Sequence, residues 1–292
     1  MGSGTLRASS YATYNTSLGR TYDVDTHRIS GQTYTAVNID SALNPRNFTV
    51  RECANSEEHP NTIPVILALD VTGSMGAACS EVAATLGKIV LSLYEKFKDI
   101  EFCIMGIGDL AYDDSPIQMS QFESDVRIAE ALDKLYIEHG GGGNSYESYT
   151  AAWYMGLYHT KLDCWEQGRK GIIITMGDEN LNPYLSLSGL KMFTNYKGQY
   201  STDIETKALY ALAKEKFDIF HISVDDKETC YAYYKKDIEN SFGQLLGSRS
   251  KVSTVNALST TIEECIEEAI NGVSESISES SIQTNENGEI SW

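Results

Sequence analysis

The sequence predicts an α/β protein whose mostly parallel central sheet is doubly wound, with helices on both faces. Short apolar runs that stop at acidic residues alternate along the chain with longer segments whose apolar residues recur every three or four positions. The apolar runs do not alternate with polar residues, which is typical of strands buried on both faces. With 292 residues, 41% of them hydrophobic, the chain is long enough for one main domain with extensions.

Residues 63–69 form the first predicted strand, an apolar run that ends at Asp70. Because ligands of open α/β sheets bind at the carboxyl ends of the strands, Asp70 is expected at the ligand-binding edge. A helix is predicted next, over about 77–97, since its apolar residues fall on one stripe. That stripe consists of Val82, Leu86, Ile89, Val90 and Leu93.

The alternation of strand and helix continues toward the end of the chain. Further strands are predicted at 101–107, 171–175 and 218–224. Helices are expected at about 120–138, 144–161, 203–217, 233–246 and 260–270. The connection at 180–200 leaves the 171–175 strand at the ligand edge, and its length exceeds what a strand-to-helix link requires, which indicates a functional role.

Three regions are expected along the chain. Residues 1–61 are rich in Ser, Thr, Tyr and Asn and lack a long helical periodicity, so we expect an N-terminal arm that is partly β or flexible. Residues 62–272 form the main domain. Residues 273–292 contain no Lys or Arg and many Ser, Glu and Asn, which predicts an acidic, flexible tail.

Charge and cysteine usage limit the classes of partner and compartment. The formal net charge of -18 disfavours nucleic acid and anionic membranes, which both require Lys and Arg to neutralise phosphate. A metal ion or another cation fits this charge better. The six cysteines are scattered without a Cys-x-x-Cys pair, no secretion-type leader is visible, and no apolar run reaches the ~18 residues of a membrane span. We therefore expect a cytoplasmic protein with small, buried, reduced cysteines.

The candidate chemistry begins at the turn after the first strand. Asp70, Thr72 and Ser74 alternate along this turn, so their side chains can converge on one point while Gly73 keeps the backbone tight. One carboxylate with two neutral hydroxyls suits Mg²⁺ or a similar cation, which prefers oxygen ligands. The simpler alternative is that these residues cap the N-terminus of the next helix.

The stretch 70–75, Asp-Val-Thr-Gly-Ser-Met, resembles the metal-ion-dependent adhesion site (MIDAS) of von Willebrand factor A (vWA) domains. In that family Asp-x-Ser-x-Ser follows the first strand, a second loop supplies a Thr, and a third loop, usually Thr-Asp-Gly, supplies another Asp. Thr72 replaces the first Ser and keeps the hydroxyl. The resemblance covers about 62–272, and it implies a Rossmann-like vWA fold that binds Mg²⁺, Mn²⁺ or Ca²⁺.

The third loop departs from the family pattern. Residues 175–177 read Thr-Met-Gly in place of Thr-Asp-Gly, so the expected carboxylate is missing. Asp178 is the nearest substitute, and Glu179 is the second choice. The metal set implied by the resemblance therefore includes Asp178 together with Asp70, Thr72 and Ser74.

The second loop departs as well. The usual Gly-Gly-x-Thr becomes a glycine run at 140–143 followed by Asn144, Ser145 and Glu147. The metal set that the resemblance implies therefore also includes Ser145, which keeps the hydroxyl, and Glu147, which would add a charge and act either through water or as a fixed internal ligand. Asp109, at the end of the second predicted strand, would lie behind the ligands and orient a water or a hydroxyl.

The leading functional hypothesis is a non-enzymatic binding module that captures an acidic group of a partner protein through the divalent cation. The family often works beside an AAA-type ATPase or in adhesion, so the resemblance implies a partner such as that ATPase or an assembly subunit. Tyr184, Tyr196 and Tyr200 in the long loop are expected to frame the site.

Two other functions compete with this hypothesis. The domain could be a structural subunit of a larger assembly with a degenerate metal site. A metal-assisted hydrolase using Asp109, Asp178 or Glu179 is disfavoured, because the sequence shows no activated nucleophile or paired base.

Overall fold

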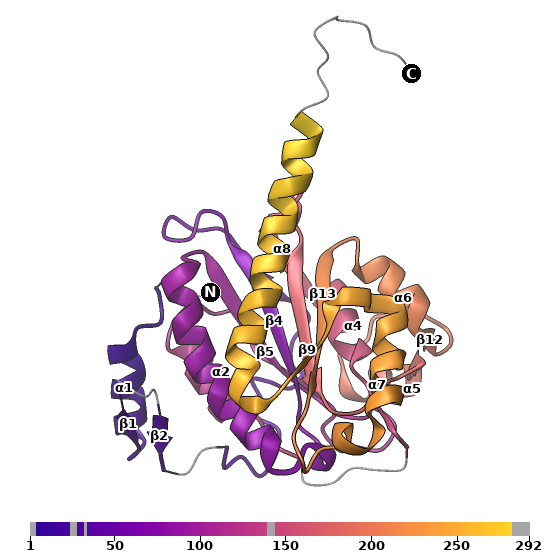
Figure 1. The fold of residues 1–292 in the computed structure, drawn as a ribbon, viewed down its shortest axis with the longest axis horizontal. Coiled ribbons are helices and arrows are strands. Elements are labelled where there is room, and N and C mark those ends of the chain that lie inside the picture. The colour runs from indigo at the N-terminus through magenta and orange to yellow at the C-terminus, as the bar shows by residue number, and fades with distance from the viewer. Residues whose placement is uncertain (1–3, 24–27, 32–33, 139–143, 282–292) are drawn as a thin grey trace, which may run out of the picture.

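A six-stranded sheet forms the centre of the computed structural model, which describes residues 4–23, 28–31, 34–138 and 144–281. Its strand order is β14-β13-β9-β4-β5-β6. The central strands β13, β9, β4 and β5 are labelled in Figure 1. All neighbours pair in parallel except β5 and β6, which are antiparallel. The strands are β4 (Ile63–Asp70), β5 (Ile100–Ile107), β6 (Ile117–Met119), β9 (Gly171–Gly177), β13 (Phe217–Val224) and β14 (Ser250–Ser253). The predicted α/β class with a mostly parallel sheet is confirmed.

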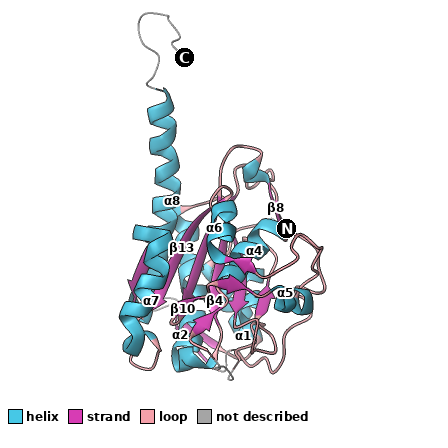
Figure 2. Cartoon of the chain, turned by 90° about the vertical axis from the view of Figure 1, so that its right-hand side faces the viewer, coloured by secondary structure: helices cyan, strands magenta, loops and turns pink. Residues whose placement is uncertain are grey.

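The sheet lies between two apolar clusters, one on each face. Successive side chains of a strand point to opposite faces, so Leu67 and Leu69 of β4 enter one cluster while Ile66 and Ala68 enter the other. The first cluster packs against α2 (Gly76–Lys96), α3 (Arg127–Asp133) and α8 (Leu258–Ser281). The second packs against α4 (Thr150–Tyr158), α5 (Leu187–Phe193), α6 (Thr206–Ala213) and α7 (Tyr231–Leu246). Figure 2 shows the strands between these helices.

Short strand pairs in the described residues connect the loops to this body. Near the ligand edge, β7 (Tyr146–Glu147) pairs with β10 (Asn180–Leu181), and β11 (Tyr184–Leu185) pairs with β12 (Ile204–Glu205). The other pairs are β1 (Thr21–Asp23) with β2 (Arg28–Ser30) and β3 (Arg51–Cys53) with β8 (Thr160–Leu162). Single 3-10 turns lie at Gly73–Met75, Asp163–Trp165, Gly247–Arg249 and Val255–Ala257.

The predicted helix at 77–97 matches α2, and all five residues of its predicted stripe are fully buried. The predicted helix at 120–138 is mostly wrong. Phe102 and Glu123 exchange backbone hydrogen bonds of 2.9 and 3.0 Å, which extends the antiparallel edge of the sheet into this segment. Helix α3 starts only after Asp125, whose carboxylate accepts the Arg127 N–H at 3.0 Å.

The N-terminal arm contains a helix that the sequence did not predict, α1 (Ala8–Ser17). Tyr11 is buried against the main domain, and Arg20 donates to both oxygens of Asp133 at 2.8 and 2.7 Å. Tyr14 donates its phenol to the same carboxylate at 2.8 Å. Because Ser, Thr and Asn favour helices only weakly, these tertiary contacts stabilise α1.

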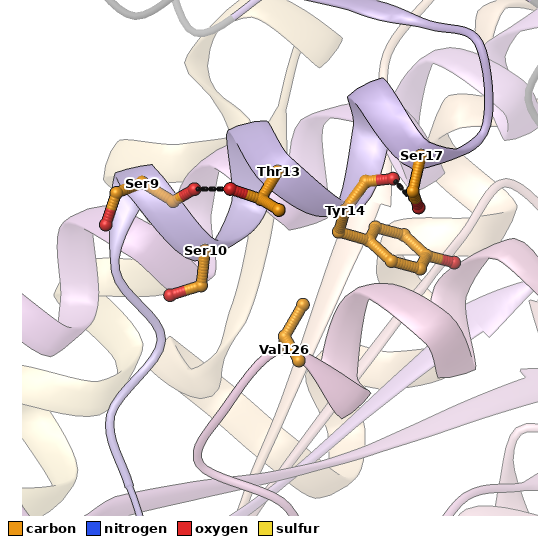
Figure 3. Close-up of a pocket in the computed structure, with 6 residues that line it drawn as sticks. All are labelled: Ser9, Ser10, Thr13, Tyr14, Ser17 and Val126. Carbon is orange, nitrogen blue, oxygen red and sulfur yellow. Dashed lines mark hydrogen bonds between the residues drawn. The ribbon is translucent and has the colours of Figure 1, made fainter.

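One face of α1 borders a shallow hollow of about 440 Å³ (Figure 3). Hydroxyl side chains of α1 and Val126 line it, and two of the hydroxyls bond to their own helix, Thr13 to the Ser9 carbonyl and Ser17 to the Tyr14 carbonyl. None of the residues that border the hollow belongs to the predicted metal set.

At the other end of the chain, α8 runs across the sheet and extends beyond the body of the domain (Figure 1). It continues to Ser281, whereas the sequence predicted a helix ending near 270, so the first part of the predicted tail is helical. The rest of that tail, 282–292, lies outside the described residues, as does the glycine run at 140–143. No helix in the described part of the chain has the length and apolar character needed to cross a membrane.

Five of the six cysteines are buried, Cys230 is half-buried, and all six are free thiols. The prediction of small buried thiols is therefore confirmed for five of them.

His221 is an ionisable group in the middle of the sheet. It is fully buried in β13, its Nδ1 lies 2.9 Å from the Thr175 hydroxyl, and its ring stacks on Phe242 with centroids 3.5 Å apart. Burial lowers the pKa of His221 to about 3, since the imidazolium would lose its hydration. The ring is therefore neutral in the folded protein near pH 7.

We expect acid to destabilise the protein through His221. Its folded pKa of about 3 lies below the unfolded value near 6.5, so its contribution is complete above about pH 6.5 and is lost as the pH falls toward 3. The loss should approach ~1.4 kcal/mol per pH unit within that window. In urea denaturation, the free energy of unfolding at pH 7 minus that at pH 5 should be lower for His221→Asn than for the wild type. An equal difference in both proteins would contradict this role of His221.

Candidate functional site

Asp70 is the last residue of β4 and is completely buried at the carboxyl edge of the sheet. Thr72 donates its backbone N–H to Asp70 Oδ1 at 3.0 Å and its hydroxyl to the same oxygen at 2.6 Å. The 3-10 turn that follows brings Ser74 back toward Thr72, with 3.1 Å between the two hydroxyl oxygens. The first predicted loop is thus a compact set of one carboxylate and two hydroxyls.

Asp178 joins this set from the end of β9. The Ser74 hydroxyl donates to Asp178 Oδ1 at 3.0 Å, and the backbone N–H of Cys230 donates to Oδ2 at 2.7 Å. Of the two third-loop candidates, Asp178 is the one bonded to Ser74, whereas Glu179 accepts from the Cys230 thiol at 3.7 Å. Four predicted residues therefore form one continuous chain of contacts, Asp70, Thr72, Ser74 and Asp178.

The hydrogen-bonded set of Asp70, Thr72, Ser74 and Asp178 has fewer hydroxyl protons than oxygen–oxygen contacts. Each hydroxyl carries a single proton. When both carboxylates are ionised, Thr72 donates its proton to Asp70 and Ser74 donates its proton to Asp178. No hydrogen then remains for the 3.1 Å contact between the two hydroxyl oxygens. Their lone pairs face each other beside two carboxylates, and this donor set suits a hard cation.

Tyr149 is a member of the site that sequence reasoning missed. Its phenol is completely buried and donates to Asp70 Oδ2 at 2.8 Å, while the backbone N–H of Glu179 donates to the phenol oxygen at 3.2 Å. A Cβ at Gly177 would overlap this phenol, so glycine is required there. The sequence signal for this contact was Gly177, next to Asp178. A glycine indicates that a side chain would not fit, but it does not show that Tyr149 is the neighbour.

The two second-loop candidates lie in different surroundings. Ser145 is exposed, and it contacts the third loop through its carbonyl, which accepts from the Asn180 side chain at 2.9 Å. Glu147 is only 4% exposed, and its Oε2 has no hydrogen-bond partner among the described residues. The pairing of β7 with β10 holds Glu147 beside the third loop. Glu147 therefore lies near enough to Asp70 for the two charges to interact, whereas Ser145 is exposed.

Asp109 belongs to a separate loop. Its Oδ1 accepts the Ala111 N–H at 2.8 Å, its Oδ2 accepts from Asn144 at 2.6 Å, and its own N–H donates to Asp113 at 2.6 Å. These bonds join the loop after β5 to the second loop. Among the described residues Asp109 forms no hydrogen bond with Asp70 or Asp178, so its hydrogen bonds shape the surrounding loop.

The electrostatics of the site disfavour its own ionised form. Burial, and then the charge of Asp178, raises the pKa of Asp70 to about 8, and burial also raises the pKa of Asp178. The pKa of Glu147 is raised to about 11 by burial and then by Asp70 and Asp113. None of these carboxyl groups forms an ion pair with Lys, Arg or His in the described part of the chain. A bound cation would favour the charged forms instead.

The residues present therefore fit a divalent cation by their chemistry. The described residues contain no group of three or more His, Cys, Asp and Glu side chains arranged to hold an ion. The candidate site at the ligand edge draws two of its oxygens from Thr72 and Ser74, which are not among those residue types. The assignment of a metal to it remains a prediction.

Two tyrosines expected to frame the site lie elsewhere. Tyr196 bonds through its phenol to the backbone of Tyr200, and the Tyr200 phenol lies 2.7 Å from that of Tyr158 in α4. Both therefore pack on the outer side of α4 instead of at the ligand edge. Tyr184, 59% exposed at the start of β11, remains available to a partner.

Comparisons by sequence found no match to any protein-family model and no curated relative. Solved structures of similar shape exist. Pilus adhesin SpaC from Lactobacillus rhamnosus GG matches at 13% identity and a TM-score of 0.47, over 75% of this chain and 31% of that chain. Proximal thread matrix protein 1 from the mussel byssus matches at 15% and 0.44, over 75% and 47%. The vWF domain of the type V pili tip protein Mfa5 from Porphyromonas gingivalis matches at 13% and 0.42, over 83% and 99%.

This chain thus spans about a third of SpaC, about half of the mussel protein and nearly all of the Mfa5 domain. With TM-scores below 0.5, these similarities assign neither a family nor a function to the chain.

Without divalent cations, we expect the contribution of Asp70 to the free energy of unfolding to fall as the pH rises from about 4 to about 8, which opposes the contribution of His221 at the acid end of this range. The folded pKa of Asp70, about 8, exceeds the unfolded value near 3.9, so its contribution is complete below about pH 4 and is lost as the pH rises through 8. Because Mg²⁺ binds the ionised form, it should raise the Tm more at pH 8 than at pH 5. Thermal denaturation in EDTA and in Mg²⁺ measures both effects.

Asp70→Asn is the matched variant for this measurement, because it keeps the shape of the side chain and removes its charge. It should abolish most of the difference between EDTA and Mg²⁺. A wild type whose Tm is the same in EDTA and Mg²⁺ at pH 8 would contradict the assignment.

Proposed function

We propose that this chain is a vWA-like protein-interaction module with a MIDAS-like site, which captures an acidic group of a partner protein through a divalent cation. Asp70, Thr72, Ser74 and Asp178 would hold the cation, with Glu147 as an additional carboxylate. The observation that carries the proposal is the 3.1 Å contact between the Thr72 and Ser74 hydroxyl oxygens, each of which also lies within hydrogen-bond distance of a buried carboxylate. Mg²⁺ is the first candidate, and Mn²⁺ or Ca²⁺ are the alternatives.

The cation would supply a bond to an anionic oxygen of the partner. Mg²⁺ keeps waters when a protein offers few carboxylates, and such a water can be exchanged for an incoming carboxylate. The residues of this chain would bind and orient the cation. The Tyr149 phenol donates to Asp70 Oδ2 and so holds the carboxylate in place. An acidic side chain on a partner is therefore the fitting ligand, and an AAA-type ATPase or an assembly subunit is a candidate carrier of it.

We favour binding over catalysis because the groups near the site are poor nucleophiles. Burial, and then the charge of Asp178, raises the pKa of the Cys230 thiol to about 12, so the thiol stays protonated near neutral pH. Cys79 is also buried, and its thiol donates to the Asp70 carbonyl at 3.3 Å. In the described residues no His lies in hydrogen-bond contact with either thiol.

One observation favours the second function, a structural subunit with a silent metal site. All four carboxylate oxygens of Asp70 and Asp178 already accept hydrogen bonds within the protein, from Thr72, Tyr149, Ser74 and Cys230. Such a network can hold the loops together without a metal.

Calorimetric titration with Mg²⁺ and Mn²⁺ separates the two functions. The wild type should bind one cation, and Ser74→Ala and Asp70→Asn should weaken that binding by about tenfold or more, because each removes an oxygen ligand or a charge. Glu166→Gln, an exposed carboxylate elsewhere on the chain, is the control and should bind like the wild type. Absence of binding to the wild type would exclude the metal site and leave the structural function.

The acidic ligand is tested with two short peptides, acetyl-Gly-Glu-Gly-amide and acetyl-Gly-Gln-Gly-amide. NMR titration should show binding of the Glu peptide in Mg²⁺ and its loss in EDTA, since the carboxylate reaches the protein through the cation. The Gln peptide should bind at least tenfold more weakly. Equal binding of both peptides would refute capture of an acidic group.

A further inference from the structure

A small pocket lies beside the proposed cation site. Its volume is about 30 Å³. It is formed where the second loop, the third loop and the N-terminal part of α7 meet, and it is lined by Ser145, Glu179, Asn180, Cys230, Tyr234 and Ile238. Glu179 therefore faces this pocket, whereas Asp178, the other third-loop carboxylate, bonds to Ser74.

Glu179 gives this pocket a negative wall. Its carboxylate accepts only a weak, 3.7 Å hydrogen bond from the Cys230 thiol among the contacts of the described residues. It forms no ion pair in that part of the chain, while Asp178, Asp109 and Asp113 add further negative charge around it. A partly buried carboxylate in these surroundings is stabilised by a cationic group from outside.

One aromatic ring lines the same pocket, and two more tyrosines adjoin its lining residues in sequence. Tyr234 lines it and remains 56% exposed, at a point where α7 departs from helical geometry with φ -119° and ψ 23°. Tyr233, which precedes Tyr234 in sequence, is 76% exposed, and Tyr146, which follows Ser145, is 42% exposed. Exposed tyrosines add contact area at low entropic cost, and their ring faces attract cations.

The size of the pocket distinguishes between basic groups. About 30 Å³ accommodates one or two water-sized groups, which suits a compact ammonium. A planar guanidinium, with its wider fork of five N–H donors, is larger than this space. The Glu179 carboxylate and the Asn180 amide oxygen can accept from an ammonium, while Ile238 and Tyr234 contact the aliphatic stem.

We propose that this pocket takes the ammonium group of a partner lysine that lies close to the acidic residue bound at the cation site. The partner motif thus combines one acidic side chain and one lysine. The pairing of the lysine with an acidic residue at the cation site rests on the proposed function. Binding of an ammonium group in the pocket itself does not require a bound metal.

The test uses the full chain and two probes of equal length, N-acetyl-lysine methylamide and N-acetyl-norleucine methylamide. Titrations are followed by NMR of protein labelled in its tyrosine rings, in EDTA so that no divalent cation contributes. The lysine probe should shift a tyrosine resonance that disappears in Tyr234→Leu. It should bind at least tenfold more tightly than the norleucine probe, and Glu179→Gln should remove that advantage.

Two controls keep this result separate from the cation site. Calorimetry with Mg²⁺ should be unchanged in Glu179→Gln, which also shows that the variant is folded. Glu166→Gln should bind the lysine probe like the wild type.

Equal binding of the two probes, or an unchanged affinity in Glu179→Gln, would overturn the lysine pocket. Loss of lysine binding in Asp70→Asn but not in Glu179→Gln would overturn it too, because the ammonium would then occupy the cation site. Failure of Mg²⁺ binding alone would overturn the proposed function and leave the pocket standing.

Discussion

Parallel pairing at the centre of the sheet positions the two loops that supply Asp70 and Asp178 to the candidate site. β4 pairs with β5 on one side and with β9 on the other, and pairs such as Leu69 with Met176 bring the strand ends level. The loops that leave these strands therefore meet at one edge. Ser74 and Asp178 form a hydrogen bond there although they lie 104 positions apart in sequence. The site is consequently as stable as the sheet beneath it, and loosening the sheet would separate its two carboxylates.

The site opposes the stability of the fold that builds it. Burying Asp70, Asp178 and Glu147 near one another is unfavourable because none of them forms an ion pair in the described part of the chain. Internal donors reach both oxygens of Asp70 and of Asp178, whereas Oε2 of Glu147 has no hydrogen-bond partner among the described residues. Perturbed carboxyl groups cluster at functional sites. A cation bound between these carboxylates would relieve the cost of burying them, and this argument for the proposed cation does not use the sequence motif.

Sequence reasoning was most successful where the spacing of the apolar residues and the length of the apolar run both indicate the same element. The apolar stripe of α2 and the strands at the centre of the sheet are examples. It failed where tertiary contacts decide the structure. Phe122 follows a helical spacing but lies in a segment held by the edge of β5, and α1 consists of weak helix formers that the Asp133 contacts stabilise. At the site, the strand-end rule gave Asp70, Thr72 and Ser74, and their proximity to Asp178 followed from the fold. Tyr149 could not be predicted, because its close neighbour in the fold is Gly177. A glycine indicates only that a side chain would not fit there.

The close contact between Gly177 and the Tyr149 phenol means that the third loop and α4 must be exchanged as a unit. Met176 belongs to the apolar cluster beneath α2 and α8, so an Asp introduced there to rebuild a standard Thr-Asp-Gly loop would be buried in hydrocarbon. A side chain added at 177 would push the phenol away from Asp70. For protein engineering, a conventional vWA loop therefore cannot be grafted onto this scaffold residue by residue, and a successful chimera would carry its own replacement for the tyrosine.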